Sequence, residues 1–212
     1  MSTFRREKTV CAVCGKEHEF MKIMSTNSMG YMDLDTRPPE MQRSTICYQI
    51  QLCDRCYYAN TSIDYLVPGF TKDVLESEGY LAVARDVAIP STAKAFLLAA
   101  ILYENARDYR SAGSLYLKAA WIFDDCRDAE RARSARLESY KMLLRSHRKD
   151  VDTSVMSVDI LRRAGEFSTA KEIAEKLLET KINDFLADIL KFQIKLAEAE
   201  DSKCHTVGEV VE

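Results

Sequence analysis

Hydrophobic and polar residues follow a helical period over most of the chain beyond Thr71. The pattern predicts one helix interrupted at Gly79, or two short helices, between Thr71 and Ala88. Pro90 then ends this helical segment, and the next helix is expected to begin at Ser91, with Ser91 as its N-cap. The connections beyond this point are short, so consecutive helices should be antiparallel neighbours. Six longer helices are expected, over 91–105, 108–124, 128–148, 152–164, 167–181 and 183–200.

Residues before Thr71 follow a different pattern. Ile46, Tyr48, Ile50 and Leu52 alternate with other residues, which predicts a half-buried strand over 46–52. A weaker strand is expected over 19–24, and the polar, proline-containing segment 25–45 is expected to be a long loop. The chain is therefore predicted to be mainly α: a small β module over 1–70, an antiparallel helical array over 71–200, and a flexible polar tail over 201–212.

Two segments of the helical part share a spacing of large and small residues that is typical of tetratricopeptide repeats, in which small residues let antiparallel helices approach closely. Gly165 of the second copy follows Arg107 of the first by 58 residues, which is not a multiple of the period of about 34. We therefore interpret helix 128–148 as the remnant of an altered middle repeat, with a plain antiparallel bundle as the alternative. The matching positions are Phe96, Ala99, Ala100, Tyr103, Arg107-Asp108-Tyr109, Ala112, Tyr116 and Ala119, and then Val158, Leu161, Gly165-Glu166-Phe167, Ala170, Ala174 and Leu177.

Four of the seven cysteines form two Cys-x-x-Cys pairs, Cys11/Cys14 and Cys53/Cys56. Each pair is a tight turn that brings two sulfurs to one side, and a tetrahedral zinc ion holds its sulfurs about 3.8 Å apart. The sequence therefore predicts a zinc-ribbon-like module with these four thiolates as ligands, and iron as the alternative metal. Because protein ligands would fill every coordination position, the zinc site is expected to be structural and to contribute to folding.

Other chemistries fit these cysteines less well. A thioredoxin-like dithiol would lie between a strand and a helix, whereas Gly15 and a strand candidate follow the first pair. Disulfides are disfavoured because the N-terminus lacks the apolar stretch of a secretory signal. A nucleobase deaminase would need a glutamate two residues after its first ligand and a proline before its cysteine pair, but Leu52 precedes Cys53. Cys47 is expected to be a strand side chain and His18 a neighbour of the site, although His18 could replace a cysteine.

The cysteine pairs, the motif Asp33-x-Asp35-x-Arg37-Pro38 between them, the run Cys56-x-Tyr58-Ala59 and the helices that follow together resemble a bacterial family known as a domain of unknown function. The resemblance covers nearly the whole chain and implies metal binding and an adaptor-like architecture. The chain departs from the family pattern by having Ala12 and Asp54 where proline is usual, and Tyr57 where glycine is usual.

Charged residues suggest further hypotheses. Segment 126–149 carries eight lysines or arginines and three acids, and six of the basic residues fall within an arc of about 100° of a helix. They could contact RNA, but residues 150–212 hold eight basic and fourteen acidic groups, so pairing within the molecule is favoured. Asp33 and Asp35 are too few for a cation cage, and a loop ion pair with Arg37 or solvation is expected instead. The six basic residues are Arg127, Arg131, Lys141, Arg145, Arg148 and Lys149.

The leading functional hypothesis is a cytoplasmic, zinc-binding interaction or scaffold protein that presents its helical array to a protein or peptide. The first alternative is RNA binding through the zinc module and helix 128–148. The second is a metal-dependent enzyme with an open site that uses His18 or Asp33.

No nucleophilic triad or glycine-rich phosphate loop is visible, so no enzyme activity is predicted. No membrane partner is expected, because the longest apolar run, Ala95 to Tyr103, has nine residues, against about 20 for a membrane span.

Overall fold

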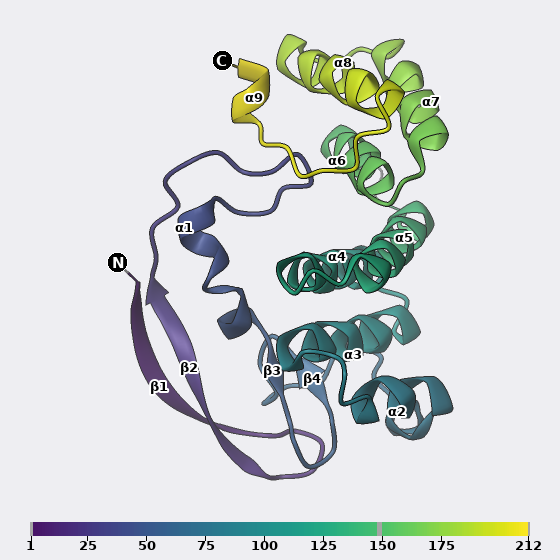
Figure 1. Ribbon diagram of the computed structural model, residues 1–212. Helices are drawn as coiled ribbons and strands as arrows, with labels where there is room; N and C mark the ends of the chain where they lie inside the picture. Colours follow the sequence, from purple (N-terminus) through teal and green to yellow (C-terminus); the bar gives the residue numbers. More distant parts are fainter. Residues whose placement is uncertain (1, 148–149, 212) are drawn as a thin grey trace.

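The computed structural model describes residues 2–147 and 150–211, and it is mainly helical with a small β part at its N-terminal end (Figure 1). The helices from α2 to α8 are stacked in a column, and the N-terminal hairpin and the loop after it run along one side of this column. The predicted fold class, a mainly α protein with a small N-terminal β module, is confirmed. No helix in the described part of the chain is both long and apolar enough to cross a membrane.

Two antiparallel hairpins form the β part, and each one ends in a Cys-x-x-Cys turn. Strands β1 (Thr3–Val10) and β2 (Glu17–Ser25) pair so that Val10 faces Glu17, next to the first cysteine turn. Strands β3 (Gln51–Leu52) and β4 (Ala59–Asn60) pair so that Leu52 faces Ala59, next to the second. Strand β2 includes the weak candidate at 19–24. The hairpins thus carry the two cysteine turns at their tips.

The strand predicted over 46–52 is largely wrong. Residues Ile46–Gln49 form a 3-10 helix, η1, and only Gln51–Leu52 is a strand. Tertiary contacts decide this segment, because Ile46 packs against the core around Trp121 and the Tyr48 ring lies 4.7 Å from the ring of Phe4. The loop predicted over 25–45 is confirmed except for one helical turn, α1 (Glu40–Arg43).

The helical part follows the predicted boundaries closely. Residues 71–88 form two short pieces, η2 (Lys72–Glu76) and α2 (Glu78–Arg85), but the break lies at Ser77, whose hydroxyl caps α2, and not at Gly79. Aspartate or asparagine side chains cap α4, α5, α6 and α8 by accepting a hydrogen bond from a first-turn N–H. The longer helices are α3 (Ser91–Asn105), α4 (Tyr109–Asp125), α5 (Ala129–Arg145), α6 (Val151–Arg163), α7 (Phe167–Leu178) and α8 (Asp184–Glu198).

Four of these helices end in the same kind of turn. In each, one residue adopts positive φ and the next residue donates its N–H to the carbonyl five positions earlier, as in a Schellman motif. Two of the turns, at Arg107 and Gly165, are those that the repeat spacing had aligned. The turns at Arg107, Arg127 and Gly165 connect α3 to α4, α4 to α5 and α6 to α7, and the turn at Glu200 leads into the C-terminal segment. The positive-φ residues are Arg107, Arg127, Gly165 and Glu200.

One hydrophobic core runs through the proposed boundary at residue 70. Cys11, Cys53 and Tyr58 of the β part belong to the same buried cluster as Phe96 of α3 and Ala112 of α4. A second cluster joins α6, α7 and α8. Leu34, from the loop after β2, is buried in this second cluster, so the loop reaches from the cysteine end of the molecule to the far helices.

Residues 201–211 do not form the frayed tail that was predicted. The backbone N–H of Leu34 donates to the carbonyl of His205, and that of Val207 donates to the carbonyl of Met32. The buried guanidinium of Arg162 binds the carbonyls of Asp201 and Lys203, and a short helix, α9 (Gly208–Val211), ends the described chain. The tail is held by hydrogen bonds to backbone groups of the long loop. Sequence patterns do not predict this pairing.

Candidate metal centre

The two cysteine turns have the same backbone geometry. In the first turn, the N–H of Gly15 donates to the carbonyl of Cys11, at 2.9 Å. In the second turn, the N–H of Tyr57 donates to the carbonyl of Cys53, also at 2.9 Å. Each turn closes on the residue after its second cysteine, so both sulfurs of a pair face the same side.

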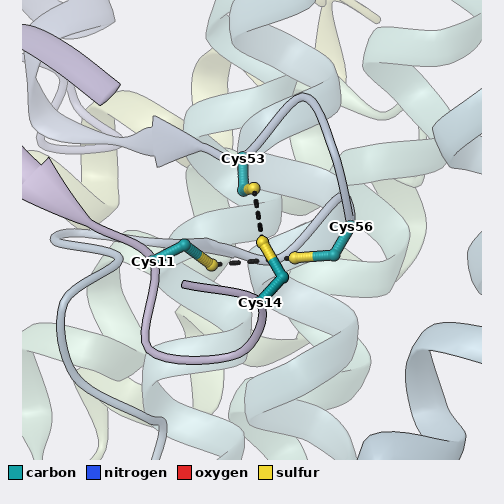
Figure 2. A group of neighbouring side chains, drawn as sticks. All are labelled: Cys11, Cys14, Cys53 and Cys56. Atoms are coloured by element: carbon teal, nitrogen blue, oxygen red, sulfur yellow. Dashed lines mark hydrogen bonds between the residues drawn. The ribbon is translucent and has the colours of Figure 1, made fainter. Parts of the chain in front are cut away.

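The four predicted ligands come together (Figure 2). The sulfurs of Cys11 and Cys56 are 3.7 Å apart, and those of Cys14 and Cys53 are 3.5 Å apart. All four sulfurs lie within 4.8 Å of one another, with Cys11 and Cys53 buried and the other two partly buried. These separations are close to the value of about 3.8 Å for sulfurs around a tetrahedral zinc ion, and far from the length of a disulfide bond of about 2 Å. The donor set therefore fits one metal ion.

Both turns need a residue with positive φ after the second cysteine. Gly15 has φ +72°, which glycine adopts without strain, whereas Tyr57 has φ +61°. A tyrosine in this conformation is unfavourable, and the surrounding structure must hold it there. Tyr80 of α2 does so, because its buried hydroxyl donates to the backbone carbonyl of Tyr57 at 2.7 Å. This hydrogen bond uses a backbone carbonyl that glycine would also offer. What tyrosine adds at position 57 is a partly buried side chain that packs against the core shared with the helices.

The pKa values of the thiols favour a cation at this site. Burial raises the pKa of Cys53 and of Cys56, so these groups resist ionisation without a positive charge nearby. Burial opposes ionisation of Cys14 too, but the backbone N–H of Lys16 and the neighbouring thiols lower its pKa overall. Four adjacent thiolates would repel one another, and a bound divalent cation removes that cost as it displaces the protons.

His18 lies beside the cysteine cluster. Its Nε2 is 3.2 Å from the sulfur of Cys53, and its side chain is only 11% exposed. The exposed carboxylate of Asp54 is 3.8 Å from the same nitrogen but binds Lys16 more closely, at 2.6 Å. The four cysteines provide a full tetrahedral set without His18, which fits its expected role as a neighbour of the site.

The other three cysteines lie outside the cluster. Cys47, Cys126 and Cys204 are exposed and unpaired, as expected for residues that are not ligands. Cys126 follows the last residue of α4. Cys204 lies near Asp33, and burial raises the pKa of its thiol to about 12.

Asp33, Asp35 and Arg37 are buried, so the expectation of a solvated polar loop is wrong. Asp35 is 0% exposed, and one of its oxygens accepts from Trp121 Nε1 at 2.8 Å and from Arg163 at 2.9 Å. The expected side-chain pair with Arg37 does not form either, because the Arg37 guanidinium binds Asp125 at 2.6 Å. The motif therefore attaches the long loop to α4 and α6. Sequence alone could not place Asp35 and Arg37, since their partners Trp121 and Asp125 lie more than 80 residues away.

The basic residues of α5 mostly pair within the molecule. Arg131 binds Asp128 and Asp86, Arg145 binds Glu104, and Lys141 binds Glu138. These three residues therefore pair within the molecule, but their partners lie between Asp86 and Glu138 and not in the acidic segment 150–212 on which the expectation rested. Arg148 and Lys149 lie outside the described residues.

A model of the family described as "Uncharacterized protein conserved in bacteria (DUF2225)" matches residues 4–184. This range includes all four cysteines, the Asp33 motif and the helices through α7, in agreement with the resemblance noted in the sequence. No curated protein and no solved structure matches the chain.

Proposed function

The chain belongs to the bacterial DUF2225 family, whose description gives no activity. From the geometry of the chain itself, we propose that it is a zinc-binding scaffold protein of the cytoplasm. The observation that carries the proposal is the closed set of four sulfurs from Cys11, Cys14, Cys53 and Cys56. A closed site has no position for water or substrate, so the ion stabilises structure and does not catalyse. Iron is the alternative metal, because four thiolates suit either ion.

The bound ion would act as a clamp between the β part and the helices. Cys11 and Cys53 share their core with α3, and Tyr80 of α2 binds the second cysteine turn. The strands of the second hairpin have two residues each, which is too short to be stable alone. A metal–thiolate site supplies the missing free energy, and its loss would loosen the β part from α2 and α3.

A scaffold role is supported by the helical stack. Tetratricopeptide-like arrays present extended surfaces to peptides and proteins. One face of this stack carries the long loop, because Leu34 packs on α6 and α8, and Asp35 binds α4 and α6. A partner of the intact protein would therefore bind beside the loop or on another face.

The alternative functions have less support. RNA binding through α5 would require free basic groups, but most of those on α5 have acidic partners. An open catalytic site would use His18 or Asp33 with only some of the cysteines. His18 lies within 4.8 Å of Cys53 and Asp54, but Cys53 is also part of the four-sulfur set. His18 contacts the cysteine cluster, whereas Asp33 pairs with Arg43.

Metal analysis of the purified, reduced protein tests the proposal. We expect a single tightly held zinc ion per chain, tetrahedral four-sulfur spectra after cobalt substitution, and loss of both in Cys53→Ser. Cys47→Ser is the matched control, because Cys47 is an exposed cysteine outside the cluster. Ordered, metal-free native protein, or tight four-sulfur binding by the Cys53→Ser variant, would contradict the assignment.

The interaction role needs a separate measurement. Pull-down with the intact protein under native conditions should capture a specific protein. Absence of any such partner, together with RNA affinity that falls steeply with salt, would favour the nucleic-acid alternative.

A further inference from the structure

An apolar pocket of about 470 Å³ opens where the long loop meets α6, α8 and the C-terminal segment. Its volume lies within the range of roughly 300–1,000 Å³ that is usual for binding sites. Leu34, Val155 and Ile189 line it and are buried in the second core cluster, so its floor is held rigidly. None of the four clustered cysteines lines it, and the metal-binding role does not use it.

The rim of this pocket exposes large apolar side chains. Tyr31, Met32 and Phe185 line the pocket and are 51%, 47% and 46% exposed. Gly208 supports the Tyr31 ring from the tail, since a Cβ at this position would lie 2.3 Å from the ring. Aromatic residues often dominate interface energies, and methionine adapts its shape to different partners. An apolar hollow with such a rim is typical of an interaction site.

Charge indicates the partner. The thirteen residues that line the pocket include Asp33 and Asp152 and no lysine, arginine or histidine. Asp33 is paired with Arg43, whereas Asp152 is exposed and has no partner among the described residues. Asp184, which precedes Phe185, is also exposed and unpaired in the described part of the chain. The pocket thus combines apolar walls with two nearby carboxylates, in the first turns of α6 and α8, that have no ion-pair partner in the described part of the chain.

We propose that this pocket docks a basic amphipathic segment of a partner protein. One or two apolar side chains of the segment enter the hollow between Met32 and Phe185, and its lysines or arginines face Asp152 and Asp184. Charge complementarity of this kind selects the partner and speeds its association. The inference rests on the proposed scaffold function and names the chemistry of the partner.

Fluorescence anisotropy with synthetic peptides tests the proposal on the intact, metal-loaded protein. The probe is a labelled amphipathic peptide of leucine and lysine about 18 residues long, and its counterpart has glutamate in place of lysine. We expect the lysine peptide to bind and the glutamate peptide to bind at least about tenfold more weakly. Met32→Ala with Phe185→Ala, and separately Asp152→Lys, should each weaken binding of the lysine peptide about tenfold.

Two controls match these variants. Val87→Ala removes an apolar side chain that is 96% exposed and remote in sequence from the pocket, and Glu78→Lys reverses an exposed acid in the first turn of α2, as Asp152→Lys does in α6. Both should leave the affinity within about twofold. Circular dichroism and metal content check that every variant folds.

The proposal is overturned if the lysine peptide does not bind, if the glutamate peptide binds equally, or if the pocket variants bind like the controls. It is also overturned if the pocket takes up a small apolar dye that the lysine peptide does not displace, because the site would then serve a small molecule. If any of these results is found while the protein still binds zinc and still captures its native protein partner, the scaffold function stands and only the docking site is wrong.

Discussion

The guanidinium of Arg163 lies 2.9 Å from the carboxylate of Asp35, although 128 residues separate them along the chain. Through its second nitrogen, Arg163 also binds Asp124 at 2.7 Å, and Asp124 in turn pairs with the buried guanidinium of Arg136. One continuous set of ion pairs therefore joins the long loop, α4, α5 and α6. These contacts place the loop over the helices, and the loop forms one wall of the apolar pocket.

Replacement of Asp35 tests this attachment. Asp35→Asn keeps the size of the side chain but removes its charge. The guanidinium of Arg163, which is nearly buried, then keeps Asp124 as its one ion-pair partner within the described residues. Loss of one partner of a buried pair is expected to lower the free energy of unfolding by about 3 kcal/mol. Urea denaturation of the two proteins measures the difference. Asp64→Asn, at an exposed position, is the control, and equal losses in both variants would contradict the role of Asp35.

Asp124 predicts a pH dependence of stability. Burial opposes its ionisation, but the arginines at 136, 163 and 37 lower its pKa overall. Its contribution to stability is therefore complete above the unfolded-state pKa of about 4 and is lost as pH falls through the lower folded-state pKa. Asp124→Asn should have a lower free energy of unfolding than the parent at neutral pH, and the difference between the two proteins should become smaller in acid. Unfolding curves measured from pH 7 to 2 would show a constant difference if the carboxylate contributed nothing.

Arg127 and Gly165 occupy equivalent positive-φ positions in two of the shared turns, with φ of +59° and +78°. Arginine is strained in this conformation, whereas glycine is not. Arg127→Gly should therefore raise the free energy of unfolding by about 0.5–1 kcal/mol. This is the strain that is removed, less the conformational entropy that glycine loses on folding. Gly165→Ala should lower it by about 1 kcal/mol. Thermal melts of both variants give the signs, and a destabilised Arg127→Gly would argue against a common turn.

The contact between His18 and Cys53 predicts a change in thiolate reactivity. A hydrogen bond from Nε2 to the ligand sulfur should make that sulfur less reactive, and a bond worth about 1 kcal/mol corresponds to about fivefold in rate. We expect His18→Ala to lose zinc about fivefold faster under N-ethylmaleimide, and His18→Gln, which can still donate, to stay near the parent rate. Cobalt charge-transfer spectra report the same contact, and identical spectra in all three proteins would show that His18 has no effect on the site.

Local rules account for much of this structure. The helices from 91 to 198 could be predicted because their apolar period is contained in short windows. The cap expected at Ser91 is wrong, since Ser91 is the first residue of α3 and Pro90 holds the N-cap position without a side-chain hydrogen bond. The grouping of the four cysteines could be predicted because two Cys-x-x-Cys turns have few other uses. The strand expected over 46–52 failed because Ile46 and Tyr48 alternate like strand residues but are held by Trp121 and Phe4.

The sequence by itself thus determined the helical stack, the two cysteine turns and the four sulfurs they offer, because each depends on residues close together along the chain. Only the tertiary structure decided where the loop and the tail lie. Asp35, Arg37 and Arg162 look like ordinary surface charges in the sequence, and they become buried because each finds partners from distant segments. Desolvating a charge is favourable only with such a partner in place, and pairing over that distance is set by the packing of the whole chain.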